Sequence, residues 1–192
     1  MDLFKYTAHE LHEKLVNKEI TAVELTNAVY DRIAAVDEQV NAYISLSKEE
    51  ALAKAAEVDA KIAAGEAIAP LAGIPVVFKD NINIYGQVTS CASKMLQGVE
   101  TVFDAHVTEE LRKEDAVFLG KANMAEFSIG NTTDNSYNGA AHNPWNLNCT
   151  TGGCATAAAV AAGEAVWALA SDTSGDLRQP AAYAGCVGIK PT

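Results

Sequence analysis

Three short apolar runs, separated by segments of helical character, constrain the fold of this chain more than any other feature. The runs cover Ile74 to Phe78, Ala116 to Leu119 and Val166 to Ala170, and each is expected to form a strand. The segments near Ala105 to Lys113 and Thr156 to Ala162 are expected to be helices. Strands that alternate with helices build sheets that are buried on both faces. The sequence therefore predicts an α/β fold, with a mixed sheet covered by helices.

Residues 1–69 are predicted to form an N-terminal helical layer, and residues 70–192 to form the α/β part. The layer contains three capping boxes, in which a Ser or Thr is followed three positions later by Glu: Thr7 with Glu10, Thr21 with Glu24, and Ser47 with Glu50. We expect the third helix to run from about Lys48 to Ala64 and to end at Gly65.

The last residues of the chain are unusually apolar for the end of a domain. Val187, Gly188 and Ile189 resemble the start of another buried strand, whereas domains normally end in polar, exposed residues. The sequence therefore predicts an incomplete α/β domain. Either the chain is a fragment or a partner supplies the missing layers.

The charge balance excludes some classes of function. The 192 residues carry 14 Lys and Arg against 25 Asp and Glu, a formal charge of −11, and no lysine or arginine lies between Lys121 and Arg178. A broad nucleic-acid surface is not expected, because phosphate binding depends on clustered basic residues. The N-terminus lacks the apolar stretch of a signal peptide, and no apolar run is long enough for a membrane helix. A soluble, cytoplasmic protein is expected, and its four widely spaced cysteines are expected to be reduced thiols.

Two features mark candidate chemistry at strand ends. Lys79 follows the apolar run IPVVF, and a lysine buried there can act as a base because burial disfavours the ammonium. From composition alone, an exposed lysine paired with Asp80 is the favoured alternative. Gly152 and Gly153 precede an alanine-rich segment, where they can admit an anion at a helix start or simply permit close packing.

Several segments together resemble the amidase signature family. They are GIPVVFKDNI (73–82), TSCASKML (89–96), LGKANMAEFSIG (119–130), HNPWNL (142–147), TGG with AAAVAAGEAVWALASDT (151–173) and RQPAAYAGCVGIKPT (178–192). The likeness is greatest to the family's A subunits of tRNA-dependent amidotransferases, and it covers only their N-terminal part. It implies a glutaminase that releases ammonia for the conversion of Glu-tRNA(Gln) to Gln-tRNA(Gln). It also implies companion subunits B and C, with tRNA held mainly by a partner. No cofactor is implied for this chain, while ATP and magnesium belong to the partner subunit.

The resemblance also implies a triad made of a lysine, a relay serine after a cis peptide bond and a nucleophilic serine. The lysine matches Lys79. The place of the relay serine holds Cys154, in a loop two residues shorter than the family pattern, and the place of the nucleophile holds Asp176. By the same resemblance, the backbone just before the nucleophile binds the oxyanion, so substrate contacts are implied for Thr173, Ser174 and Gly175, and for Ser128 in MAEFSIG.

These substitutions predict an impaired enzyme. A carboxylate attacking an amide would have to expel an amine through a mixed anhydride, a poor exchange compared with a serine ester. An aspartate close to Lys79 would also stabilise the ammonium, so an ion pair would replace a base and its nucleophile. Loss of a triad member typically lowers the rate by roughly three to six orders of magnitude.

Other interpretations stay open at this point. The chain could be a small-amide amidase of the same family, or a noncatalytic paralogue that acts as a binding partner, or its substitutions could be errors in the sequence. Cys154 could serve as a thiolate nucleophile, although a small apolar filler is favoured. A zinc site formed by His142, Cys149 and Cys154 is disfavoured because the spacing fits no standard knuckle. Ser174 is favoured as part of the oxyanion loop over a substitute nucleophile, and Arg178 is expected to pair with Asp172 or Asp176.

Overall fold

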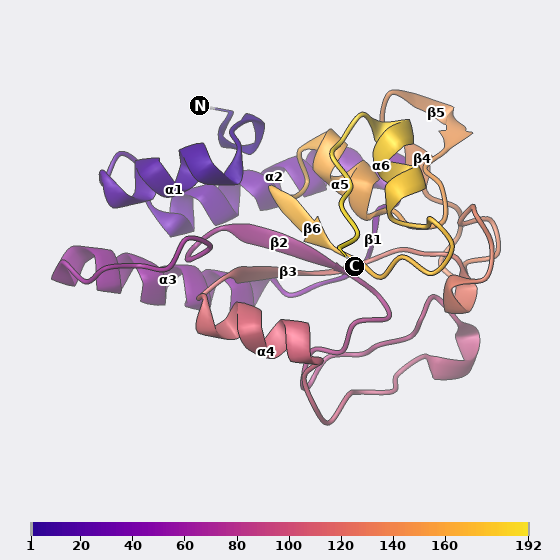
Figure 1. Ribbon diagram of the computed structural model, residues 1–192, viewed down its shortest axis with the longest axis horizontal. Coiled ribbons are helices and arrows are strands. Elements are labelled where there is room, and N and C mark those ends of the chain that lie inside the picture. The colour runs from indigo at the N-terminus through magenta and orange to yellow at the C-terminus, as the bar shows by residue number, and fades with distance from the viewer. Residues whose placement is uncertain (1, 192) are drawn as a thin grey trace.

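A four-stranded mixed sheet forms the centre of the computed structural model, which describes residues 2–191 (Figure 1). The strand order is β1-β3-β2-β6. Strand β2 (Pro75–Lys79) pairs in parallel with both β3 (Val117–Ala122) and β6 (Trp167–Leu169), while β1 (Tyr43–Leu46) pairs antiparallel with β3. The predicted α/β fold with a mixed sheet is therefore confirmed.

The two faces of the sheet pack against different helices because side chains alternate along a strand. Val77 and Leu119 belong to the larger core, which also contains residues of α1 (Ala8–Val16), α2 (Ala22–Val40), α3 (Lys48–Ala64) and α5 (Thr156–Ala162). Val76, Phe78 and Phe118 belong to a smaller core that includes Leu111 of α4 (His106–Lys113). Figure 1 shows α4 across the sheet from α2 and α5.

Two of the three predicted capping boxes are confirmed, and the third is wrong. Thr7 and Thr21 each accept a hydrogen bond from the backbone of the glutamate three positions later, whose side chain bonds back to the threonine N–H. The side chain of Ser47 makes no cap bond. Its partner Glu50 instead accepts a 2.8 Å hydrogen bond from Gln87, which lies far away in the sequence. Helix α3 still ends at Gly65 as predicted.

Several elements were not predicted. Strand β1 lies within the segment expected to be helical, and it packs so closely on β3 that a Cβ at Gly120 would collide with the backbone oxygen of Ser45. The other missed elements are short: η1 (Leu3–Lys5), η2 (Lys94–Leu96), η3 (Glu126–Ser128), β4 (His142–Asn143), β5 (Asn146–Thr150) and α6 (Arg178–Ala184). Within residues 2–191, no helix is both long and apolar enough to cross a membrane.

The buried strand predicted at Val187 to Ile189 is wrong. This segment forms no strand, and the exposed fractions of Val187 and Ile189 are 90% and 74%. An extended segment is buried only where a neighbouring strand and a covering layer are available. Among the described residues, β2 is the only strand paired with β6, so the outer edge of β6 carries no such neighbour.

Candidate active site

Lys79 lies at the carboxyl end of β2, next to the segment that follows β6. Because β2 and β6 are parallel, their carboxyl ends meet at one edge of the sheet, which is where α/β proteins gather functional residues. The side chain of Lys79 is completely buried. The segment after β6 brings Ser171 and Asp176 to the same place.

The ammonium of Lys79 forms an ion pair with the carboxylate of Asp176, and both side chains are fully buried. The Nζ atom of Lys79 also lies 3.1 Å from Oγ and 3.2 Å from the carbonyl oxygen of Ser171. The alternative of an exposed lysine paired with Asp80 is wrong, since Asp80 pairs with Lys121 instead, at 3.3 Å. A buried charge needs a partner, and here the partner is Asp176, as expected if the two residues lay close together.

The carboxylate of Asp176 also engages backbone donors in its own loop. Its Oδ1 atom accepts hydrogen bonds from the N–H groups of Thr173 at 2.6 Å and Ser174 at 3.4 Å. The N–H of Gly175 donates to Asp172 at 2.5 Å. All three backbone donors expected to contact a substrate oxyanion are therefore directed at carboxylates of the chain itself.

Of the two interpretations of Gly152 and Gly153, the structure favours close packing over an anion site at the start of α5. A Cβ at Gly153 would lie 2.9 Å from the Cβ of Asp176, and a Cβ at Gly152 would lie 2.8 Å from the ring of Pro180. These contacts bring the start of α5 against the loop that holds Asp176. The two glycines thus position the loop and leave no room for a side chain between the two segments.

Cys154 is completely buried beside this ion pair. Its Sγ atom lies 3.2 Å from the hydroxyl oxygen of Thr156. Burial raises the pKa of the Cys154 thiol, although the charge of Lys79 opposes this rise. A raised pKa lowers the thiolate fraction, so the geometry favours a space-filling thiol over a nucleophile. The resemblance implied a cis peptide bond before the relay position, whereas within residues 2–191 no peptide bond is cis.

A polar chain that was not predicted from the sequence links Ser128 to Lys79. The amide nitrogen of Asn81 lies 2.8 Å from Oγ of Ser171 and 3.4 Å from Oγ of Ser128, and Ser171 in turn contacts Lys79. Ser128 is buried and has a positive φ of 58°. The parallel pairing of β2 and β6 is the signal that could have identified Ser171, because it places the residues after both strands together.

A second buried ion pair lies at the end of β3. Lys121 contacts Asp80 at 3.3 Å and the hydroxyl of Thr89 at 2.9 Å, and it is fully buried. Burial lowers the pKa of Lys121, while the charge of Asp80 opposes this shift. Asp80 also accepts hydrogen bonds from the backbone and hydroxyl of Ser90. This hydrogen-bonded cluster supports the end of β3 beside the site.

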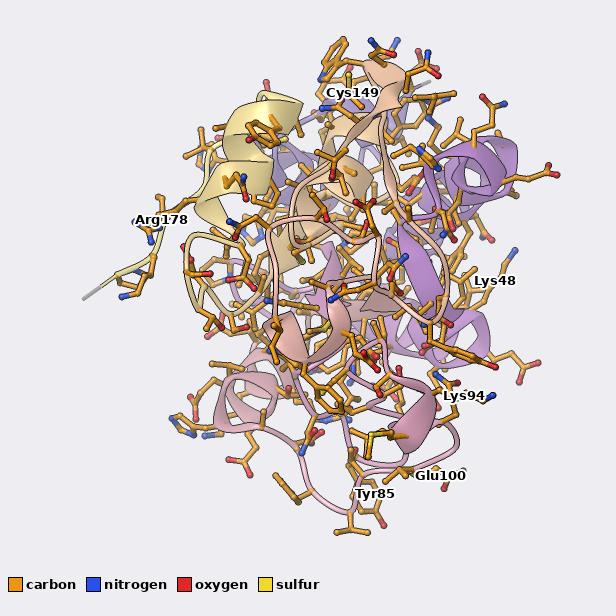
Figure 2. The ribbon with its side chains drawn as sticks, turned by 90° about the vertical axis from the view of Figure 1, so that its right-hand side faces the viewer. Lys48, Tyr85, Lys94, Glu100, Cys149 and Arg178 are labelled. Atoms are coloured by element: carbon orange, nitrogen blue, oxygen red, sulfur yellow. The ribbon has the colours of Figure 1, made fainter. Side chains whose placement is uncertain are left out.

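The remaining candidates are the suggested zinc ligands and Arg178. No group of three or more His, Cys, Asp and Glu side chains among residues 2–191 is arranged to hold a metal ion, so His142, Cys149 and Cys154 do not form one. Figure 2 shows Cys149 on the β4–β5 hairpin and Arg178 at the outer side of α6. Arg178 pairs with Asp172 at 2.5 Å, one of the two partners expected.

Comparison with known proteins places this geometry in a family context. A family model described as Amidase matches residues 24–192. The chain is 51% identical to the A subunit of glutamyl-tRNA(Gln) amidotransferase from Clostridium botulinum, over all of this chain and 40% of that relative. The structure of the same type of subunit from Thermotoga maritima matches with a TM-score of 0.82 and 37% identity, over all of this chain and 39% of that one. A peptide amidase bound to chymostatin matches with a TM-score of 0.91 and 36% identity, over 98% of this chain and 40% of that one.

Proposed function

This chain belongs to the amidase family, and from that membership we propose that it is an A-subunit homologue whose own glutaminase centre is silenced by an internal ion pair. The observation that carries the proposal is the position of Asp176. The carboxylate of Asp176 pairs with Lys79, the expected base. It also accepts hydrogen bonds from the backbone N–H groups of Thr173 and Ser174, which are expected to stabilise an oxyanion. The chain spans about 40% of the length of its curated relatives, so the activity of the whole protein is part of the proposal.

The ion pair removes the chemistry of the site in two ways. An ammonium cannot accept a proton. Moving the ammonium of Lys79 away from Asp176 would leave that buried carboxylate without its partner. The backbone donors of Thr173 and Ser174 would have to release Asp176 before they could stabilise a substrate oxyanion. Both steps would have to occur before any amide could react.

Binding to companion subunits does not require this chemistry. In the proposed role the chain associates with subunits of the B and C type in the cytoplasm, and tRNA, ATP and magnesium belong to the partner. Co-purification with those subunits in the absence of glutaminase activity would support a noncatalytic role.

A chimera tests whether the centre is silenced. Because the chimera has the full length of the relative, a low rate cannot be attributed to the shorter length of this chain. The matched part of the Clostridium botulinum relative is replaced by this chain, and ammonia release from glutamine is measured. We expect a rate lower by roughly three to six orders of magnitude than that of the parent. A second chimera carries Cys154→Ser and Asp176→Ser and restores the two missing loop residues, and it should recover turnover. Turnover of the first chimera close to that of the parent would refute the proposal.

One contact favours a second candidate, an amidase that uses Ser171 as its nucleophile. The hydroxyl of Ser171 lies within hydrogen-bond distance of both Lys79 and Asn81. This candidate requires Lys79 to lose its proton despite the ion pair with Asp176. It predicts residual ammonia release in the first chimera that is abolished by Ser171→Ala, whereas the silenced centre predicts no effect of that substitution.

A further inference from the structure

The two edges of the sheet differ in chemical character. The edge at β1 borders a cavity of about 520 Å³ whose lining includes the charged residues Lys48, Glu49 and Glu50. Charged side chains at a sheet edge discourage the addition of another strand. Along β6 runs a groove of about 570 Å³, and among residues 2–191 none of the side chains that line it is charged. The β6 edge therefore lacks the protection that the β1 edge has.

Apolar side chains remain partly uncovered along this groove. Strand β2 is buried at every position, but Trp167, Ala168 and Leu169 of β6 are all only half-buried. Val187 and Ile189 also line the groove and are largely exposed. Contiguous apolar surface of this kind marks interaction sites in soluble proteins.

A hydrogen-bond donor beside the groove is unsatisfied. The indole Nε1 of Trp167 is buried and finds no acceptor among the described residues. Most buried donors in folded proteins are bonded, and leaving one unbonded costs about 1 to 3 kcal/mol. The outer backbone edge of β6 is likewise unpaired by any strand within residues 2–191. The unpaired edge fits a partner that brings a strand.

We propose that this groove docks a polypeptide equivalent to the part of the amidotransferase A subunits that this chain does not span, with one of its strands extending the sheet at β6. The chain matches about 40% of those subunits, so about 60% of their length is available to cover it. The matched part has the fold of the Thermotoga maritima subunit, which supports the same packing surface in both. The proposal rests on family membership and is independent of whether the catalytic centre is silent.

Co-expression tests the docking directly. The full chain is produced together with an affinity-tagged segment of the Clostridium botulinum subunit that begins where its match to this chain ends. We expect a 1:1 complex on affinity purification, confirmed by light scattering. A Val187→Lys and Ile189→Lys double variant should reduce the affinity at least about tenfold, because charges would be placed against an apolar partner. Leu46→Lys, at the opposite edge of the sheet and 48% exposed, is the matched control and should bind normally.

The measurement separates loss of docking from loss of folding. Because Val187 and Ile189 are exposed, their replacement should leave the circular dichroism spectrum and the melting temperature unchanged. Absence of a complex between two soluble partners would overturn the proposal. So would a complex that Val187→Lys and Ile189→Lys leave intact. A homodimer of this chain that those substitutions disrupt would also overturn it, by assigning the groove to a second copy.

Discussion

Glu164 provides the most quantitative prediction, because its carboxyl group is fully buried beside the carboxyl group of Asp37. No N–H or O–H donor of the described residues bonds its carboxyl oxygens, and the residue is fully buried in the segment between α5 and β6, within hydrogen-bonding reach of the Asp37 carboxyl group. Burial, followed by the nearby charge of Asp37, raises the pKa of Glu164 from 4.5 to about 9, while Arg32 opposes the rise. At neutral pH, Glu164 is therefore protonated in the folded protein and ionised in the unfolded chain.

The sign and size of the effect follow from proton linkage. The folded state holds one more proton than the unfolded state between the two pKa values, so stability is greatest below about pH 4.5 and falls as the pH rises towards 9. At 1.36 kcal/mol per pH unit, the titration of Glu164 makes the free energy of unfolding about 3 kcal/mol lower at pH 7 than below about pH 4.5. A neutral glutamine does not titrate, so Glu164→Gln removes this dependence.

Urea unfolding followed by circular dichroism at pH 5.5 and pH 7.5 measures the effect. Any packing change caused by the glutamine is the same at both pH values, so it cancels in the comparison. The stability of Glu164→Gln relative to the original chain should rise by about 2 to 3 kcal/mol between the two conditions. Glu38→Gln, at an exposed position of α2, should show no such rise. A difference between Glu164→Gln and the original chain that does not change with pH would refute the reasoning.

Three further predictions follow from single contacts. Cys154 should react with iodoacetamide far more slowly than the exposed Cys149 in the folded protein, and equal rates would contradict a buried thiol with a raised pKa. Thr21→Ala should lower the free energy of unfolding by about 1 kcal/mol in chemical denaturation, whereas Ser47→Ala should change it little because Ser47 makes no cap bond. Gly120→Ala should prevent the close approach of β1 to β3 and lower the melting temperature by several degrees, and an unchanged melting temperature would argue against this strand contact.

Local patterns in the sequence predicted the fold better than they predicted its long-range contacts. The boxes at Thr7 and Thr21 depend only on residues three positions apart, and both are present. The box at Ser47 failed because Gln87 binds the carboxylate that would have completed it. Strand β1 was missed because it has only four residues and is defined by its pairing with β3. Competition of this kind cannot be read from the spacing of residues.

The candidate site shows the same division. The sequence predicted that Asp176 would form an ion pair with Lys79 if the two lay close together, and the structure contains that pair. The capture of the N–H groups of Thr173 and Ser174 by the same carboxylate depends on the path of the loop, which no motif specifies. Ser171 was missed because its contact with Lys79 arises only when β2 and β6 pair in parallel.

The buried ion pair has a consequence for the evolutionary history of the chain. No single nucleotide change converts an aspartate codon into a serine codon, so the shortest routes at position 176 pass through glycine, asparagine, alanine or tyrosine. Each of these intermediates would leave the ammonium of Lys79 buried without its counter-charge, and loss of one partner of such a pair typically costs about 3 to 5 kcal/mol. That loss would be a large share of the stability of a domain of this size. Selection for folding alone would therefore keep the acid in place, regardless of any benefit from a serine at this position.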